Sequence, residues 1–275
     1  EKMKQRKAGC PGKLKYLAGK RILPEPISRK TDIVKLIDNM DAYNGGRLRA
    51  ACHLLRDKYS QNDVTVGLSL AGALTPAGLG PSAIIPLMNH GFVDWLTATG
   101  ANMYHDLHFA FNLPMHRGSH VVDDVDLRDK GVTRIYDILF DYEDVLMETD
   151  RRLRKLLLQP EFQKEMGTRE FYHHLGKVMN EYEEKNKLGE VSIVAAAYRN
   201  GIPVFTSSPG DSTIGMNIAG LELLAETAGL QDAFRLKINP SIDVNDSTAI
   251  ILNAKRYDKG KTGVILIGGG SPKNF

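Results

Sequence analysis

Apolar residues follow two different periods along the chain. Four short apolar runs rich in β-branched residues predict strands over residues 64–70, 92–96, 202–205 and 263–267. Apolar residues at helical spacing predict a helix that follows Thr31 as its N-cap, and further helices over 47–59, 142–159, 171–187, 192–200, 214–230 and 244–256. Because strands alternate with helices, the pattern predicts an α/β fold in which a parallel sheet carries helices on both faces.

A stretch of small residues follows each predicted strand. These stretches cover residues 71–78, 97–102, 206–213 and 268–271 and are rich in Gly, Ala, Ser and Thr. Ligands of parallel sheets bind beyond the carboxyl ends of the strands, and small residues let the backbone approach a phosphate closely. The four stretches therefore favour a nucleotide or anion site, although neither the G-x-G-x-x-G nor the Walker A pattern is present.

Composition and charge add three expectations. Of the 275 residues, 42% are apolar and 25% are charged, as in ordinary globular proteins, and a net charge of +3 does not favour nucleic acid as a partner. Residues 1–21 hold eight Lys or Arg and one acid, so we expect a basic arm over 1–30 and a single α/β domain over 31–275. The uncharged stretch 64–93 contains three prolines and five glycines, which argues against a membrane helix, and we expect a cytoplasmic protein.

Histidines cluster in one part of the chain. Four of the eight lie within residues 105–120, and three acids accompany them: Asp106, Asp123 and Asp124. On a helix His105 and His108 would share one face, so a metal-dependent hydrolase is one alternative. Pro114 and Gly118 interrupt the segment and no standard zinc-protease spacing is present, so we expect no metal.

Asp211 has two interpretations that the sequence leaves open. It follows a predicted core strand in the run Ser-Ser-Pro-Gly-Asp-Ser-Thr and precedes a predicted helix. It could be the N-cap of that helix, a role that Ser212 or Thr213 would fill equally well. Its carboxylate could instead face a ribose hydroxyl or an amine, and its place at a strand end slightly favours this second interpretation.

Ordered motifs in three parts of the chain carry a family resemblance. They are VDWLTATGANMYHDL at 93–107, IPVF at 202–205 with PGDSTIG at 209–215, and ILIGGGSPK at 265–273. Together they resemble the deoxyhypusine synthase family, in particular its bacterial deoxyhypusine-synthase-like branch, and the likeness extends from about residue 33 to the last residue. The resemblance implies a Rossmann-like α/β fold, a homotetramer built from tight dimers with active sites at the dimer interface, and NAD as cofactor.

The resemblance also implies a transferase activity. In this family NAD oxidises the polyamine spermidine, an aminobutyl unit is cleaved and transferred as an imine to an amine acceptor, and the hydride returns to the imine. The acceptor in deoxyhypusine synthases is a lysine of the hypusine-bearing translation factor, whereas related homospermidine synthases use putrescine. A relative that binds NAD or polyamine without catalysis is the alternative from a different functional class.

Matching the family motifs residue by residue gives candidate ligand-binding positions. Residues implied to contact NAD are Gly72, Ala73, Leu74, Thr75, Pro76, Thr99, Gly100, Ala101, His105 and Asp211. Residues implied to contact substrate are Tyr104, His105, Gly269 and Asn274. No residue is assigned to catalysis, because the family's catalytic lysine, in a Trp-Gly-Lys context, is expected beyond Phe275.

The chain departs from the family pattern at ionisable positions. Tyr104 and His105 stand in place of an acidic pair, Met216 in place of a polyamine-binding aspartate, and Asn274 in place of a histidine. Methionine cannot pair with an ammonium group and an amide cannot act as a general base. We therefore expect a small diamine or polyamine acceptor, as in homospermidine synthesis, held by the acids near the histidine cluster: Asp106, Asp123 and Asp124.

Overall fold

The computed structural model describes residues 16–19, 21–23 and 25–275. Residues 1–15, 20 and 24 belong to the predicted basic arm, most of which lies outside the described residues. The chain divides into two units, residues 1–58 and residues 59–275. The arm over 1–30 and the single domain over 31–275 remain predictions.

The described part of the first unit is helical. Its elements are α2 (Ile33–Asp38), α3 (Tyr43–Leu54) and a π-helical segment (Leu55–Tyr59) that continues into the second unit. The helix predicted after Thr31 is present, but Thr31 as its N-cap is wrong. Asp32 caps α2, because its carboxylate accepts a hydrogen bond from the Lys35 N–H at 2.7 Å, whereas Thr31 bonds to Ser28.

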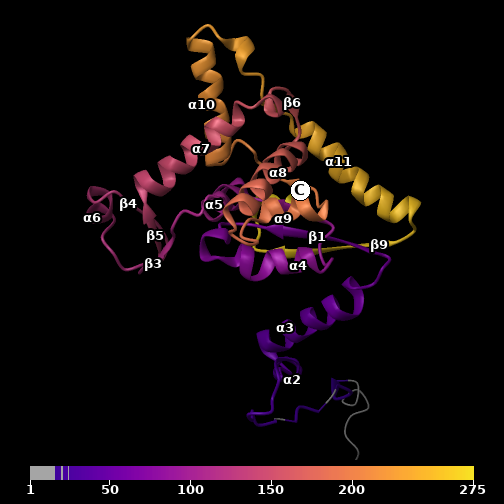
Figure 1. The fold of residues 1–275 in the computed structure, drawn as a ribbon. Helices are drawn as coiled ribbons and strands as arrows, with labels where there is room; N and C mark the ends of the chain where they lie inside the picture. The colour runs from indigo at the N-terminus through magenta and orange to yellow at the C-terminus, as the bar shows by residue number, and fades with distance from the viewer. Residues whose placement is uncertain (1–15, 20, 24) are drawn as a thin grey trace, which may run out of the picture. The chain divides into compact units, whose positions relative to one another are not determined.

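A four-stranded parallel sheet forms the centre of the second unit (Figure 1). Its strands are β1 (Val64–Leu70), β2 (Trp95–Ala98), β7 (Val204–Phe205) and β9 (Lys261–Ile267), in the order β7-β2-β1-β9. Each strand overlaps one of the four predicted runs, and every pairing is parallel. The predicted parallel α/β fold is therefore confirmed.

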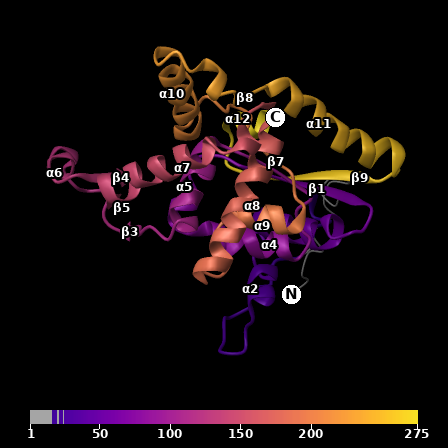
Figure 2. The same cartoon turned by 45° about the horizontal axis from the view of Figure 1, so that its top comes forward.

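Helices connect the strands. They are α4 (Ile85–Asn89), α5 (Gly100–Ala110), α7 (Glu148–Leu157), α8 (Thr168–Asn186), α9 (Ile193–Asn200), α10 (Thr213–Thr227), α11 (Pro240–Leu252) and α12 (Gly270–Asn274). Short 3-10 or π-helical segments lie at Thr75–Ala77, Gly80–Ile84, Tyr142–Met147, Pro160–Phe162, Gln231–Ala233 and Asn253–Tyr257. Figure 2 shows α4 and α9 on one side of the sheet and α11 on the other. With helices on both sides, all of β2 and most of β1 are buried.

Close packing between β1 and β2 depends on one glycine. Trp95 pairs with Gly67 across the two strands, and its indole ring lies over the glycine. A Cβ atom on Gly67 would lie 2.3 Å from the indole ring, closer than any real contact. Glycine at this position therefore makes room for the indole above the centre of the sheet.

Two small sheets lie outside the central one. An antiparallel sheet combines β3 (His116–Arg117), β4 (Val132–Ile135) and β5 (Ile138–Asp141), with α6 (Asp124–Asp129) beside it, and it projects away from the central sheet (Figure 1). A parallel pair joins β6 (Glu165–Met166) to β8 (Lys237–Ile238). The sequence does not predict these strands, because two to four residues are too few to establish an alternating pattern.

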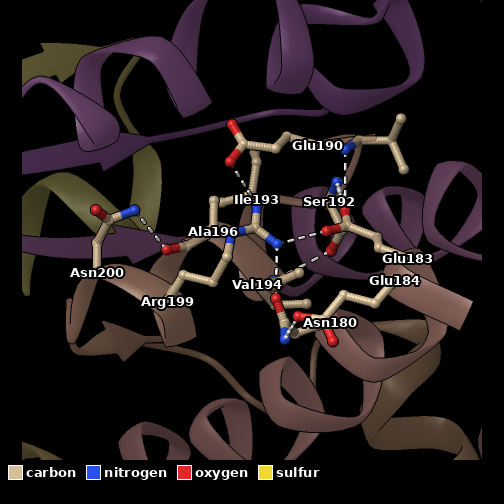
Figure 3. A network of polar contacts seen from close by, with 12 residues as sticks. Asn180, Glu183, Glu184, Glu190, Ser192, Ile193, Val194, Ala196, Arg199 and Asn200 are labelled. Atoms are coloured by element: carbon tan, nitrogen blue, oxygen red, sulfur yellow. Dashed lines mark hydrogen bonds and ion pairs between the residues drawn. The ribbon is translucent and has the colours of Figure 1, made fainter. Parts of the chain in front are cut away.

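Buried carboxylates fix the start of α9. Glu183 of α8 accepts hydrogen bonds from the Val191 and Ser192 N–H groups and from Arg199 (Figure 3). From α5, Asp106 accepts from the Ser192 hydroxyl at 2.7 Å and from the Ile193 N–H at 2.8 Å. These bonds anchor α5 to α9, and so hold α5 in place at the sheet.

Candidate functional site

The four stretches of small residues meet at the carboxyl edge of the central sheet. The turns after β1 and β9 are joined by a hydrogen bond from the Ala71 N–H to the Ile267 carbonyl, at 3.0 Å. The turns after β7 and β9 are joined by the Ser208 and Ser271 hydroxyls, whose oxygens lie 2.9 Å apart. The structure thus brings together the regions in which the sequence predicts a nucleotide or anion site.

Asn102 holds the turn after β1 in its conformation. This fully buried amide accepts hydrogen bonds from the Leu74 and Thr75 N–H groups, at 2.7 and 3.3 Å, and donates to the Gly72 carbonyl at 3.1 Å. The Thr99 hydroxyl donates to the same carbonyl at 2.6 Å. Gly72 has a φ of +66°, which favours glycine. The predicted NAD-contacting turn 72–76 is therefore rigidly tied to the start of α5, through an asparagine to which the sequence assigned no role.

Two helix starts are in contact at this edge. Thr99 is the N-cap of α5 and Ser212 is the N-cap of α10, and a Cβ atom on Gly100 would lie 2.3 Å from the Ser212 Cβ. First-turn N–H groups lack partners within a helix and carry partial positive charge, so this pair of starts favours an anion. Since Ser212 is the cap, the exposed Asp211 beside it is not required for capping.

The residues at the sheet edge fit a dinucleotide. Gly268 has a φ of +88°, and a Cβ atom there would lie 2.9 Å from the Ala71 Cβ, so the backbone at this turn needs glycine. A cavity of about 350 Å³ lies beside the start of α10 and is lined by Pro209, Gly215 and Ile218 among others. The cavity is mostly apolar but is also lined by Glu222 and Lys237. Paired helix starts for a pyrophosphate, a mostly apolar cavity and an exposed carboxylate for a ribose are groups that suit a dinucleotide.

Tyr104 lies buried between α5 and α7. It is 1% exposed, and its hydroxyl contacts the Leu146 carbonyl at 3.2 Å and Asp150 Oδ1 at 2.8 Å. Burial, together with the neighbouring Asp150 carboxylate, raises the pKa of the phenol above its usual range, so that it stays a hydrogen-bond donor. Direct contact between Tyr104 and substrate remains a prediction.

Gly269 and Asn274, the other predicted substrate contacts, belong to the short helix after β9. Gly269 is the N-cap of α12 and Asn274 is its last residue. Asn274 is exposed, and its side-chain amide donates to the Gly270 carbonyl at 3.3 Å. Gly269 lies within the converging turn after β9 and Asn274 follows that turn on the chain, and their substrate contacts also remain predictions.

His105 and His108 form a hydrogen-bonded pair. His105 Nδ1 lies 3.0 Å from His108 Nε2, and His108 Nδ1 lies 2.8 Å from the Thr149 hydroxyl. Phe140 of β5 packs against both rings. Burial lowers the pKa of His105 to about 4 and that of His108 to about 3, so that both imidazoles are uncharged at neutral pH. The shared helix face predicted for them is confirmed.

The three acids near the histidines make contacts within the fold, and their role in holding an amine remains a prediction. Asp106 is 1% exposed and caps α9, Asp123 caps α6, and Asp124 forms an ion pair with Arg134 at 2.7 Å. Successive helix residues point about 100° apart, so Asp106 lies on a different face from His105. Within the described residues no group of three His, Cys, Asp or Glu side chains has a metal-binding arrangement.

The fold defines an α/β protein of the parallel class, with a candidate ligand site at the strand ends. The deoxyhypusine synthase family model matches residues 32–275, so the chain belongs to the deoxyhypusine synthase family and the predicted resemblance is confirmed. No described helix has the length and apolar character needed to span a membrane.

Individual relatives carry related names. A "Deoxyhypusine synthase-like protein" of Nostoc sp. is 48% identical over 258 residues, which cover 94% of this chain and 65% of the relative. A "Probable deoxyhypusine synthase 2" of Methanosarcina acetivorans is 33% identical, over 91% of this chain and 68% of the relative. The crystal structure of a candidate deoxyhypusine synthase from Entamoeba histolytica is similar to this structure, with a TM-score of 0.60 at 15% sequence identity. The match covers 90% of this chain and 79% of the Entamoeba chain, and it supports the assignment of the fold. The chain thus spans about 65% of the length of the Nostoc relative.

Proposed function

We propose that the protein is an NAD-dependent aminobutyl transferase that uses spermidine or a related polyamine as donor. One observation carries this proposal: in a chain of the deoxyhypusine synthase family, the four glycine- and serine-rich turns meet at one sheet edge beside two helix starts. Bound NAD would accept a hydride from the polyamine and return it after the transfer. The turns 72–76 and 99–101 would orient the cofactor, with Asp211 on a ribose hydroxyl.

The acceptor in this proposal is a small amine, as in homospermidine synthesis. Met216 and Tyr104 have a thioether and a phenol in place of the carboxylates that the family pattern has at these positions. Tyr104 is also fully buried. Modification of a hypusine-bearing translation factor is the competing outcome, and a non-catalytic NAD or polyamine binder is the alternative from another class.

We also propose a cytoplasmic homotetramer. Leu223 and Leu224 on α10 are each 60% exposed, and Val264 and Leu266 on β9 are 39% and 47% exposed. Exposed large apolar side chains, here on each of these two elements, are typical of surfaces that become buried on assembly.

Calorimetric titration of NAD into the purified protein tests the cofactor assignment. We expect NAD to bind, and Asp211→Ala to weaken binding about 10-fold or more, because a carboxylate bonded to a ribose is lost. Asp232→Ala removes another exposed carboxylate, in the loop after α10, and serves as the matched control. A protein that binds no NAD, or that binds it equally well after Asp211→Ala, would refute the assignment.

A further inference from the structure

A polyamine site needs an anionic partner, and neither positions 104 and 216 nor the acids near the histidines supply a free one. An ammonium group removed from water requires a carboxylate or an equivalent acceptor, since an unpaired buried charge is strongly unfavourable. Tyr104 and Met216 carry no charge, and the acids near the histidines are engaged in caps and an ion pair. The remaining carboxylates around α5 and α10 therefore decide whether an ammonium can be held here.

Asp150 of α7 lies against both of these helices. Its Oδ1 atom accepts a hydrogen bond from the Tyr104 hydroxyl of α5 and another from the Asn217 amide of α10, each at 2.8 Å. Tyr104 is four residues beyond Gly100, where α5 starts, and Asn217 is four beyond Thr213, where α10 starts. Asp150 thus contacts one residue in each helix that lies about one helical turn, ~5 Å along the helix axis, beyond the two helix starts that flank the candidate site.

Only one oxygen of this carboxylate is used. Both donors bond to Oδ1. In the described part of the chain, the buried side-chain atoms without a hydrogen-bond partner are Trp95 Nε1, Thr97 Oγ1 and His174 Nε2. Asp150 Oδ2 is not among these atoms, although neither of the two hydrogen bonds reaches it. Since Asp150 is only partly buried, we infer that Oδ2 is accessible to solvent.

Asp150 also has no direct ion-pair partner among the described residues. Among the described residues, no Lys, Arg or His nitrogen lies within 4.0 Å of its carboxylate oxygens. The nearby cations on α7 have other partners: Arg151 and Arg152 both bond to Glu148. Arg154, one helical turn further on, donates to the Asn217 side-chain oxygen at 2.5 Å. Next to Tyr104 on α5, His105 is uncharged at neutral pH, so it does not neutralise the carboxylate either. Tyr104 and Asn217 hold the group in one orientation, and its second oxygen stays free for a cation.

We propose that Asp150 binds one ammonium group of the amine substrate, replacing from α7 the carboxylates that are absent at positions 104 and 216. This inference rests on the proposed function. A single carboxylate anchors one end of a diamine, in keeping with a small acceptor such as putrescine. Asp150 acts in specificity, and no proton or hydride transfer is assigned to it.

Calorimetric titration of putrescine, and separately of spermidine, into the purified protein with NAD present tests the proposal. Asp150→Asn removes the charge while retaining an oxygen acceptor for Tyr104 and Asn217. We expect it to weaken amine binding roughly 10- to 100-fold, the effect of losing a charge-assisted hydrogen bond, and to leave NAD binding unchanged. The control Asp144→Asn removes an exposed carboxylate in the turn that leads into α7 and should bind amines like the parent protein.

Asp150→Glu provides a second variant if Asp150→Asn does not fold. It keeps the charge but moves it by one methylene, so amine binding should weaken less than in Asp150→Asn while still differing from the parent. Amine binding at parental strength in either variant would overturn the role of Asp150 and leave the proposed function intact. A parent protein that binds NAD but no amine would overturn the proposed function together with this inference.

Discussion

Asp106 offers a quantitative test of how the fold holds α5 in place. This carboxylate is 1% exposed and accepts from the Ser192 hydroxyl and from the Ile193 and Val194 N–H groups, at 2.7, 2.8 and 3.3 Å. Asp106→Ala leaves these donors without an acceptor in a dry interior, at about 1–3 kcal/mol each for the two short bonds. Ser192 still caps α9 through the Ala195 N–H, so we expect a loss of roughly 3 kcal/mol.

The ionisation of Asp106 gives the same residue a pH signature. Burial, opposed by its hydrogen bonds, raises its pKa from 3.8 to about 6. The folded state therefore holds a proton that the unfolded state has lost between about pH 4 and 6, and this contribution to stability decreases as the pH rises through that window. The difference between the pKa values in the unfolded and folded states corresponds to about 3 kcal/mol of stability when the carboxyl group is fully protonated. Relative to Asp106→Asn, the parent protein should gain this stability on acidification from pH 7 to 4.

Urea denaturation followed by circular dichroism measures both effects. Midpoints are compared for the parent, Asp106→Asn and Asp106→Ala at several pH values, with slopes that should agree between variants. A loss below 1 kcal/mol in Asp106→Ala would mean that the cap of α9 does not depend on Asp106. If the difference in the free energy of unfolding between the parent protein and Asp106→Asn stays constant from pH 7 to 4, the reasoning about the ionisation of Asp106 is refuted.

Two further predictions concern the histidine pair and the centre of the sheet. The imidazole resonances of His105 and His108 should not titrate between pH 5 and 8 in NMR spectra, because burial lowers both pKa values well below 6.5, and an inflection near pH 6.5 would contradict their burial. Gly67→Ala places a methyl group against the Trp95 indole and should lower the free energy of unfolding by about 1–3 kcal/mol in the same urea assay. An unchanged midpoint would mean that the indole moves aside freely.

The sequence predicts the central sheet well because its strands are buried. The run 64–70 coincides with β1, whose last five residues are all buried and apolar or small. The predicted run 92–96 starts before β2, because Asp94 uses its carboxylate to accept from the Val66 N–H at 2.6 Å and strand pairing begins only after it. The small sheet of β3, β4 and β5 gives no comparable signal.

Site residues are predictable only where they follow a strand. Gly72, Gly100 and Asp211 are found from their places after apolar runs. Within a helix, residues that are neighbours in sequence point in different directions. Asp106 directly follows His105 but bonds to the start of α9, so its place in the sequence does not predict its partners. Asp150 lies 46 residues from Tyr104, and no local pattern connects the two.

Phe140 makes the small antiparallel sheet part of the surroundings of the site. Its ring, on β5, lies 6.2 Å from the His105 ring and 5.5 Å from the His108 ring, centroid to centroid. A shortened protein that joined α5 directly to α7 would keep every strand of the central sheet and still lose this ring. Water would then reach the imidazoles and allow them to become cations near neutral pH, beside the place where an ammonium substrate is expected to bind. Through Phe140, the small antiparallel sheet thus contributes to the burial that keeps the two imidazoles uncharged.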